Sequence, residues 1–288
     1  MPRRHPDWLK VKLPSGERYM KVRSLIVEKG LHTVCQSARC PNIEECFNRG
    51  VATFMILGNI CTRNCRFCNI ASGEPEAVDP KEPLRVAQAV RQLALSYSVV
   101  TSVSRDDLPD GGAEQFARTI KTIKELNPGC EVEVLIPDFK GSEGSLKKVL
   151  EQRPKVINHN IETVRRLYPI VRPQADYHRS LSLLKQVKSL VPNILTKSGL
   201  MVGLGEEYEE VLEAIEDLKE IDCDILTIGQ YLQPSKEHLP VKKYYHPQEF
   251  QDLKRFALKT GFSWVEAGPL VRSSYHADRP FREPADFA

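Results

Sequence analysis

Short apolar runs alternate with helical patterns along most of this 288-residue chain. Six runs have the length and apolar content of buried strands; they are residues 53–57, 99–103, 132–136, 156–160, 200–203 and 225–228. Between them, apolar residues recur at helical spacing, most clearly over residues 181–190, 208–218 and 250–257. Strands that alternate with helices in this way are typical of a parallel sheet with crossover helices.

The number of strand and helix repeats predicts an open barrel. Six repeats are fewer than the eight of a closed barrel, so we expect an α/β fold, an incomplete (β/α)6 TIM-like barrel, over residues 51–267. Residues 1–50 lack a clear apolar period and are predicted to form an irregular N-terminal extension. Residues 268–288 contain Pro, Arg and Asp and are predicted to form an irregular C-terminal tail.

Polar side chains gather directly after the predicted strands. They are Arg105, Asp106, Asp107, Asp138, His159, Asn160, Glu162, Glu206, Glu207 and Gln230. In parallel α/β folds the site is built at the carboxyl ends of the strands. We therefore expect these loops to face one cavity.

Composition and charge exclude several classes of partner. Charged residues make up 27% of the chain, and no apolar run approaches the roughly 20 residues that cross a bilayer, so no membrane partner is expected. The 41 basic and 38 acidic side chains nearly balance and are scattered, which argues against nucleic acid. No signal core follows the short basic N-terminus. A cytoplasmic, reducing location is expected, where cysteines act as ligands more often than as disulfides.

Three cysteines form a loop directly after the first predicted strand. Cys61, Cys65 and Cys68 are separated by three and then two residues. Three thiolates can hold three irons of a four-iron cluster, which leaves the fourth iron open to a substrate. The alternative is a structural zinc knuckle, but a closed zinc site needs a fourth Cys or His, which this loop does not supply.

A second triplet lies in the predicted extension. Cys35, Cys40 and Cys46 have little apolar sequence around them, which favours a second metal centre over surface or packing cysteines. Cys130 and Cys223 stand alone at strand edges and are predicted to be buried packing residues. No seventh cysteine joins either triplet, so another donor must complete the second centre. An oxygen donor would be weaker than a thiolate and easier to displace.

The loop of residues 61–68 resembles the cluster-binding motif of the radical S-adenosylmethionine (SAM) superfamily. Other segments are similar to the lipoyl synthase family in particular; they are residues 35–46, 52–58, 101–112, 158–163, 201–206 and 272–275. The resemblance extends from residue 6 to residue 278. Two cysteine triplets combined with a terminal Arg-Ser-Ser-Tyr are highly specific, whereas the three-cysteine loop alone would indicate only the superfamily.

The resemblance implies two 4Fe-4S clusters. Cys61, Cys65 and Cys68 would hold the cluster that binds SAM. An auxiliary cluster would be held by Cys35, Cys40, Cys46 and a serine of the terminal motif. Ser274 is the better match for that serine and Ser273 is the close rival; the alternative for both is an exposed tail with ordinary hydroxyls.

The resemblance also implies the activity, that of a sulfurtransferase. A radical made from SAM would allow two sulfur atoms to be inserted at C6 and C8 of an octanoyl chain carried on a lysine of a lipoyl carrier domain. The auxiliary cluster would be the sulfur donor, and Ser274 would dissociate as an iron is lost. The implied partners are an octanoylated lipoyl carrier domain or H-protein, an electron donor such as ferredoxin or flavodoxin, and an iron–sulfur carrier that rebuilds the cluster. Two alternatives stay open: another radical SAM enzyme that inserts sulfur, and a zinc-stabilised binding protein.

Three residues near the first triplet are candidate contacts of SAM. Phe67 is predicted to contact the adenine, with simple packing beside the cluster as the alternative. Arg105 and Asp106 are predicted to lie near the carboxylate and amine of SAM, with a surface ion pair as the alternative. Ser104 departs from the family pattern, in which an acidic residue is expected at this position.

Three further candidates follow the fourth predicted strand. Asn158, Asn160 and Glu162 are predicted to hydrogen-bond the ribose and the methionyl amine of SAM. A helix cap made by Asn160, with Glu162 in the first turn, is the alternative. His159 and His276 have no metal-ligand spacing and are assigned no catalytic role.

Overall fold

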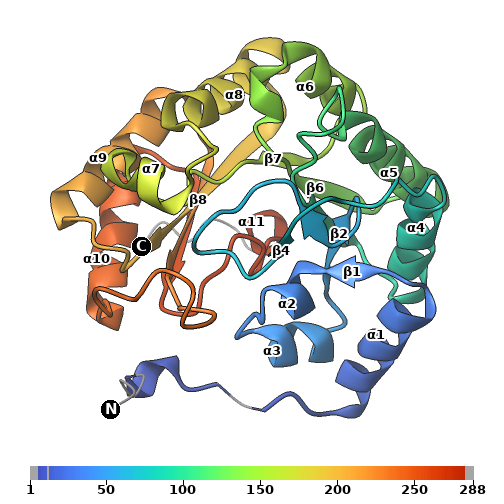
Figure 1. Cartoon of the computed structure of the whole chain (residues 1–288), viewed down its shortest axis with the longest axis horizontal. Coiled ribbons are helices and arrows are strands. Elements are labelled where there is room, and N and C mark those ends of the chain that lie inside the picture. Colours follow the sequence, from blue (N-terminus) through green and yellow to red (C-terminus); the bar gives the residue numbers. More distant parts are fainter. Residues whose placement is uncertain (1–5, 12, 283–288) are drawn as a thin grey trace.

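The computed structural model describes residues 6–11 and 13–282, and it confirms the predicted α/β barrel with one open side (Figure 1). Residues 1–5, 12 and 283–288, which belong to the predicted extension and tail, lie outside the described residues. Within the described part of the chain the main sheet has eight strands in the order β1-β2-β5-β6-β7-β8-β9-β10. β1 runs antiparallel to β2, and each later neighbouring pair is parallel.

The strands of the main sheet are β1 (His32–Thr33), β2 (Thr53–Ile56), β5 (Tyr97–Ser102), β6 (Glu131–Leu135), β7 (Val156–Asn158), β8 (Leu195–Val202), β9 (Ile225–Gln230) and β10 (Trp264–Gly268). A separate parallel pair is formed by β3 (Ile60–Cys61) and β4 (Ala71–Ser72). The helices around the barrel are α4 (Glu82–Gln92), α5 (Ala113–Leu126), α6 (Glu143–Leu150), α8 (Tyr177–Leu190), α9 (Tyr208–Glu220) and α10 (Pro247–Thr260). The remaining elements are η1 (Asp7–Leu9), α1 (Glu17–Glu28), α2 (Val34–Ser37), α3 (Ile43–Asn48), η2 (Phe139–Gly141), η3 (Arg165–Leu167), α7 (Tyr168–Val171) and α11 (Arg279–Arg282).

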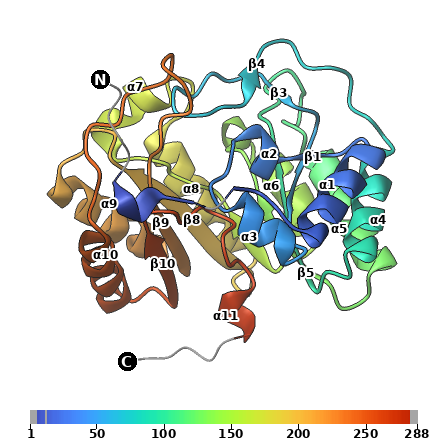
Figure 2. The same ribbon diagram turned by 90° about the horizontal axis from the view of Figure 1, so that it is seen from below.

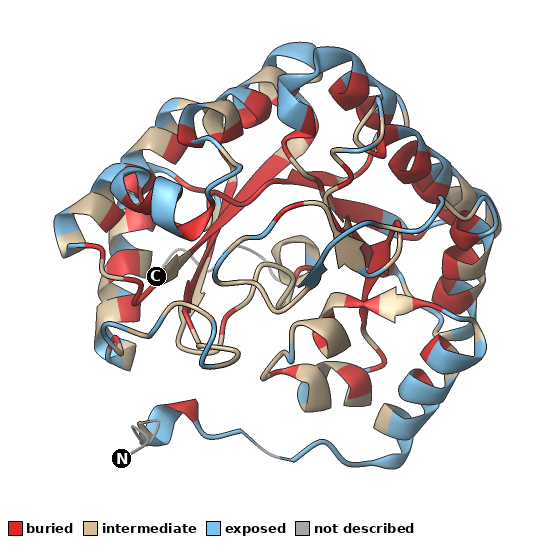
Figure 3. Cartoon of the chain, viewed as in Figure 1, coloured by how far each residue is buried: buried red, intermediate tan, exposed pale blue. Residues whose placement is uncertain are grey.

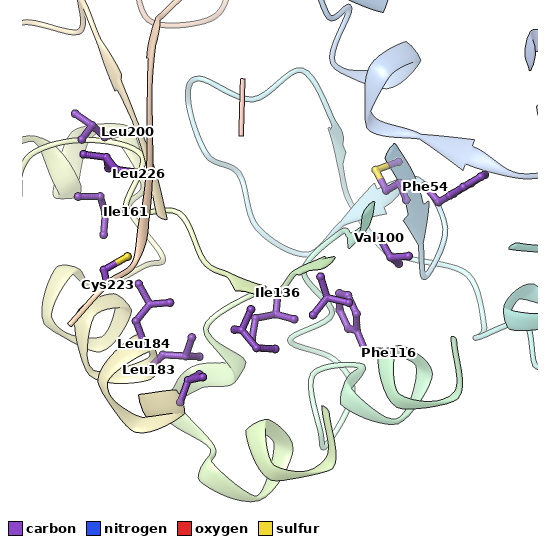
Figure 4. Close-up of a cluster of buried hydrophobic side chains, with 14 of the residues drawn as sticks. Phe54, Val100, Phe116, Ile136, Ile161, Leu183, Leu184, Leu200, Cys223 and Leu226 are labelled. Carbon is purple, nitrogen blue, oxygen red and sulfur yellow. The ribbon is translucent and has the colours of Figure 1, made fainter. Parts of the chain in front are cut away.

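The core lies between the strands and the inner faces of the surrounding helices. Figure 3 shows buried strands inside a ring of helices whose outer faces are exposed. In the close-up of Figure 4, Phe54 and Val100 lie on the same side of the barrel as Phe116 of α5. Cys223 belongs to this apolar cluster (Figure 4), and Cys130 is also buried, which confirms the predicted packing role of both cysteines.

Two strands differ from the pattern of apolar runs. β8 begins five residues before the predicted run because its first half carries polar residues that are nevertheless buried, Lys197 among them. β10 was not predicted, because the segment contains Glu266 and ends at Gly268, so it has no continuous apolar run. β10 pairs with β9 in parallel and forms the last strand of the barrel.

The predicted extension is more regular than expected. α1 buries only Val22 and Ile26, which are four residues apart on one face, so the helical period is weak in the sequence. α1 packs against α3, and β1 pairs with β2 at the edge of the main sheet. The prediction of an irregular stretch was therefore wrong for these segments, which are helices and a short strand attached to the barrel.

A buried ion pair explains why β8 tolerates a lysine inside the barrel. Lys197 Nζ lies 2.9 Å from Glu133 Oε1, and both side chains are at most 3% exposed. Tyr97 Oη also donates to Glu133, at 2.8 Å. Glu133 on β6 thus accepts donors from β5 and β8, which ties three strands together inside the barrel.

The first prediction concerns this pair. Lys197→Met leaves the Glu133 carboxylate buried without its cation, and we expect it to lower the free energy of unfolding by about 3–5 kcal/mol. Urea unfolding of the cluster-free protein, followed by circular dichroism, measures this change. The double variant Lys197→Met/Glu133→Leu is expected to recover part of the loss. Equal free energies of unfolding for the wild type and Lys197→Met would contradict a stabilising role for this ion pair.

Candidate functional site

The first cysteine triplet lies on a loop at one end of the barrel. Cys61 closes β3, and Figure 2 shows β3 and β4 on the opposite side of the barrel from α11. The backbone N–H groups of Arg63 and Ser104 donate to Cys61 Sγ at 3.4 and 3.3 Å. Two backbone donors from different loops therefore fix the position of the Cys61 sulfur.

A buried arginine holds this loop against the ends of two strands. Arg63 donates to both carboxylate oxygens of Asp106 at 2.7 and 3.0 Å, and to Asp138 at 2.6 Å. Burial alone would raise the pKa of Asp138, but the hydrogen bond and charge of Arg63 lower it to about 2. Because Asp106 follows β5 and Asp138 follows β6, the cluster loop is fixed to the carboxyl end of the sheet. The sequence identified both aspartates as polar residues after strands, but gave no signal for Arg63.

A second contact holds the loop from the far side of the barrel. His238 Nε2 lies 3.0 Å from the carbonyl oxygen of Cys68, and Leu239 N donates to the carbonyl of Arg66 at 3.2 Å. Tyr231 Oη in turn donates to the Leu239 carbonyl at 2.7 Å. The segment after β9 thus holds the cysteine loop in place through two hydrogen bonds. No motif in the sequence indicated this contact.

The cysteines of this triplet are partly buried. Burial raises the pKa of Cys68 to about 12, and the neighbouring Cys65 and Cys61 raise it further. Burial also raises the pKa of Cys65, while the nearby positive charge of Arg172 opposes the shift. Without metal these two sulfurs hold their protons, so loading the site releases protons.

The second triplet forms the wall of a small cavity at the open side of the barrel. Cys35 of α2, Cys40, and Cys46 of α3 line it together with Thr53 and Ser274. Thr53 Oγ1 donates to Ser274 Oγ at 2.8 Å. Three thiols and one hydroxyl from distant parts of the chain therefore face the same space, and Ser274 is the serine that faces it. Ser273 makes its contacts elsewhere.

Burial shapes the chemistry of these thiols as well. It raises the pKa of Cys35 to about 11 and of Cys46 to about 12, with a further contribution from neighbouring cysteines in each case. Burial also raises the pKa of Cys40, against the charge of Arg272. Each thiol is thus close to another member of its triplet.

Tyr275 and His276, which follow Ser274, attach the C-terminal tail to the N-terminal extension. Tyr275 Oη donates to Glu45 Oε2 at 2.9 Å, and His276 Nε2 lies 3.2 Å from Glu45 Oε1. His276 Nδ1 lies 3.5 Å from a carboxylate oxygen of Glu266 on β10. Glu45 precedes Cys46 on α3, so these contacts hold the tail beside the second triplet. His276 has a positioning role here, which its isolation in the sequence did not reveal.

The three polar residues predicted after the fourth strand lie together. Asn160 Nδ2 donates to Glu162 Oε1 at 3.0 Å, and Asn158 ends β7. Glu162 has a φ of 66°, a conformation that is uncommon for a non-glycine residue and often marks a functional site. The helix-cap alternative is wrong, because the next helical turn begins at Arg165 and its N-cap residue is Val164.

The other predicted SAM contacts have partners within the chain. Arg105 is buried and its guanidinium lies 2.8 Å from a carboxylate oxygen of Asp107, whereas Asp106 pairs with Arg63. The alternative of a surface ion pair is therefore correct in that both residues form ion pairs, but in each pair the arginine is buried. Phe67 is half-buried and packs against the core. A direct contact of these residues with SAM stays a prediction.

His159 and the larger surface hollow lie outside both triplets. Burial lowers the pKa of His159 to about 4, and its ring nitrogens lie 2.8 Å from Ile136 O and 3.1 Å from Ser180 Oγ, as in a packing residue. A hollow of about 460 Å³ lies beside the loops that follow β5 and β6. It contains Asp106 but none of the six triplet cysteines.

The donor sets fit iron–sulfur clusters better than single ions. Within residues 6–11 and 13–282, no three His, Cys, Asp or Glu side chains converge as they would around one metal ion. A closed zinc site requires four such donors at about 2.0–2.3 Å from the metal. Two sets of three free cysteines, one of them with a serine hydroxyl, instead match the ligand types of four-iron clusters.

The tail can reach the second triplet only because one barrel residue lacks a side chain. A Cβ on Gly229 of β9 would lie 2.2 Å from the Val271 carbonyl oxygen. We expect Gly229→Ala to push the tail away from the barrel and to lower the activity that the resemblance implies, sulfur insertion, by about tenfold or more. The variant should also lose iron from the second site, which iron and sulfide analysis measures. In the control variant Gly144→Ala the new Cβ meets nothing within 4 Å, so both readouts should match the wild type. Full iron content and activity in Gly229→Ala would contradict this role.

Within the described ranges, none of the helices has the length and apolar character needed to cross a bilayer.

Comparisons with known proteins identify the family of the chain. The model of the radical SAM superfamily matches residues 55–218, and that of the N-terminal domain of lipoyl synthase matches residues 2–40. The chain is 57% identical over 272 residues to the lipoyl synthase of Rubrobacter xylanophilus, covering 94% of this chain and 85% of the relative. It is 58% identical over 275 residues to that of Caldanaerobacter subterraneus subsp. tengcongensis, covering 96% of each.

Solved structures share the fold at low sequence identity. SuiB from Streptococcus suis, solved with S-adenosylmethionine bound, aligns with a TM-score of 0.59 at 12% identity, over 84% of this chain and 56% of that one. Methylornithine synthase aligns with a TM-score of 0.53 at 14% identity, over 86% of this chain and 81% of that one. At these identities both likenesses show the fold alone.

Proposed function

The chain belongs to the lipoyl synthase family of radical SAM enzymes, and on this basis we propose how its residues divide the family's reaction. The reaction inserts sulfur at C6 and C8 of an octanoyl chain, and it uses SAM and two 4Fe-4S clusters. Membership of this family argues against both alternatives that the sequence left open, another sulfur-inserting enzyme and a zinc-stabilised binding protein. The division of residues is the part that we propose.

Cys61, Cys65 and Cys68 hold the cluster that binds SAM. When bound, this cluster supplies the electron that splits SAM, and the auxiliary cluster supplies the inserted sulfur. Arg63 keeps the loop in place through its two aspartate partners, while His238 holds the loop at Cys68. The protein's task here is to orient SAM and to exclude water and stray hydrogen donors.

Cys35, Cys40, Cys46 and Ser274 hold the auxiliary cluster. The observation that supports this assignment is the shared cavity, which these three cysteines and Ser274 line together. A hydroxyl oxygen is a weaker ligand for iron–sulfur clusters than a thiolate, so Ser274 would be the most easily displaced of the four ligands. Thr53, which donates to Ser274, keeps the hydroxyl oriented towards the cavity.

Asn158, Asn160 and Glu162 are the proposed contacts of the ribose and methionyl amine of SAM. Their support is the cluster that they form at the end of β7. Phe67, Arg105 and Asp106 are proposed to lie at the edge of the same site. On this proposal residues 1–50 and 268–288 carry the auxiliary cluster, and residues 51–267 form the SAM-binding barrel.

Enzymes of this family act on lipoyl carrier substrates and need a reductant. We propose that the substrate is an octanoylated lipoyl carrier domain or H-protein and that ferredoxin or flavodoxin delivers electrons. An iron–sulfur carrier would rebuild the auxiliary cluster after turnover. All eight cysteines lie in the described part of the chain and are free of disulfides, which supports a reducing, cytoplasmic setting.

The proposed function is tested by anaerobic incubation of the reconstituted protein with an octanoyl-lysine peptide, SAM and a strong reductant. Mass spectrometry should detect a peptide with two added sulfur atoms, and chromatography should detect 5′-deoxyadenosine. Formation of 5′-deoxyadenosine without any sulfur in the peptide, when all eight irons are present, would contradict sulfur insertion into this substrate.

A further inference from the structure

The two adjacent serines of the tail face different neighbours. Ser274 lines the cavity of the second triplet, whereas Ser273 lies between two carboxamides at the end of β7. Ser273 Oγ accepts from Asn158 Nδ2 at 2.8 Å and donates to Asn160 Oδ1 at 2.9 Å. One hydroxyl therefore joins the tail to both asparagines.

Both carboxamides are held from their other sides by carboxylates. Asn158 Nδ2 also donates to Glu133 Oε1 at 3.3 Å, and Asn160 Nδ2 donates to Glu162 Oε1 at 3.0 Å. Asn158 is fully buried and Asn160 is 8% exposed, so water cannot easily replace a lost partner. These contacts leave Ser273 as the group that fixes the distance and orientation between the two asparagines.

The backbone opposite Asn160 is shaped for this arrangement. A Cβ on Gly199 of β8 would lie 3.0 Å from Asn160 Oδ1, the atom that accepts from Ser273. Absence of a side chain at Gly199 therefore leaves room for the carboxamide to reach the tail. Without the Ser273 hydroxyl, Asn160 Oδ1 would lose its donor, and a buried acceptor without a partner is costly enough to make the side chain turn.

We propose that Ser273 is a positioning residue for SAM: it fixes Asn158 and Asn160 in the orientation that binds the cofactor. The inference rests on the proposed function, in which these asparagines contact SAM. The two serines then have separate roles. Ser274 is a ligand of the auxiliary cluster, and Ser273 orients the asparagines that bind SAM. Because one short segment serves both sites, the position of the tail and the affinity for SAM are linked in both directions.

Binding of SAM to the reconstituted protein tests the proposal without turnover. Ser273→Ala is expected to weaken SAM binding about tenfold in anaerobic equilibrium dialysis, as for loss of one buried hydrogen-bonded group. Iron and sulfide content should stay at the wild-type value, because the Ser274 hydroxyl still faces the second triplet. Ser273→Thr retains the hydroxyl and should restore most of the affinity. Ser189→Ala, an exposed serine on α8, is the matched control and should change nothing.

A double-mutant cycle separates positioning from a general loss of structure. Because Ser273 acts in part through Asn160, the loss of SAM affinity in Ser273→Ala/Asn160→Ala should be smaller than the sum of the losses in the two single variants. Thermal unfolding of each variant shows whether it is folded. If Ser273→Ala does not fold, Ser273→Cys replaces it: a thiol is a weaker hydrogen-bond donor and acceptor than a hydroxyl, so this variant should weaken SAM binding while the auxiliary cluster retains its iron.

Three outcomes would overturn the inference. Wild-type affinity for SAM in folded Ser273→Ala would do so, and so would additive losses in the double variant. Loss of auxiliary iron from Ser273→Ala with unchanged SAM affinity would assign Ser273 as the cluster ligand instead. Failure of the wild-type protein itself to bind SAM would contradict the proposed function, and that result is distinct from the other three.

Discussion

Cys65→Ala is expected to abolish reductive cleavage of SAM, with formation of 5′-deoxyadenosine lowered by more than about 10³-fold. Cys65 is the proposed middle ligand of the first triplet, and it is partly buried close to the positive charge of Arg172. With only Cys61 and Cys68 left, the loop cannot hold three irons of a four-iron cluster in the geometry that leaves one iron open. Chromatographic assay of 5′-deoxyadenosine under anaerobic, reducing conditions measures the loss.

The matched control for Cys65→Ala is a cysteine outside both triplets. Cys130 is buried directly before β6 and belongs to neither triplet, so Cys130→Ala should retain cleavage of SAM. Cys65→Ala should lose roughly half of its iron, because the auxiliary cluster is held by other residues. Cleavage of SAM at the wild-type rate in Cys65→Ala would contradict the assignment of the first triplet as the ligands of the SAM-binding cluster.

Ser274→Cys is expected to separate cleavage of SAM from sulfur insertion. A thiolate is a softer and firmer ligand for iron than a hydroxyl oxygen, so the auxiliary cluster should assemble but resist loss of an iron. We expect insertion of sulfur to fall by about 10²-fold while 5′-deoxyadenosine continues to form. The ratio of dithiolated peptide to 5′-deoxyadenosine, measured in one reaction, reports this separation.

Ser273→Cys is the comparison for Ser274→Cys. The Ser273 hydroxyl lies between Asn158 and Asn160, away from the cavity of the second triplet, so a thiol at this position cannot take over as the fourth ligand. Ser273→Cys should therefore alter SAM binding and leave the auxiliary cluster as in the wild type. Wild-type insertion of sulfur by Ser274→Cys would contradict the role of Ser274 as the ligand that leaves.

Much of the barrel could be predicted because its strands are continuous apolar runs. Residues 53–57 and 225–228 became β2 and β9 within one or two residues. β10 and the first half of β8 escaped prediction because their polar residues are stabilised by partners distant in sequence, such as Glu133 for Lys197. A local pattern cannot reveal a partner that only the folded sheet brings into reach.

In the candidate site, too, local features could be predicted from the sequence and contacts between distant residues could not. The spacing of cysteines and the resemblance to a family indicated both triplets, because spacing is a local property of the sequence. The direction of Ser273 and Ser274 was left open, since it depends on how the tail passes Gly229 and reaches Thr53. The ion pairs of Arg63 were likewise invisible, because they join a loop to two strand ends.

The central claim is that three thiolates leave one iron of the first cluster open to SAM. The most direct test uses the variant Cys35→Ala/Cys40→Ala/Cys46→Ala, which retains only that cluster, reduced and mixed with SAM labelled with ¹⁵N in its amine. Electron–nuclear double resonance should detect coupling between the cluster and the labelled nitrogen. A cluster whose spectrum does not change on addition of SAM, with no coupling to the label, would contradict the account.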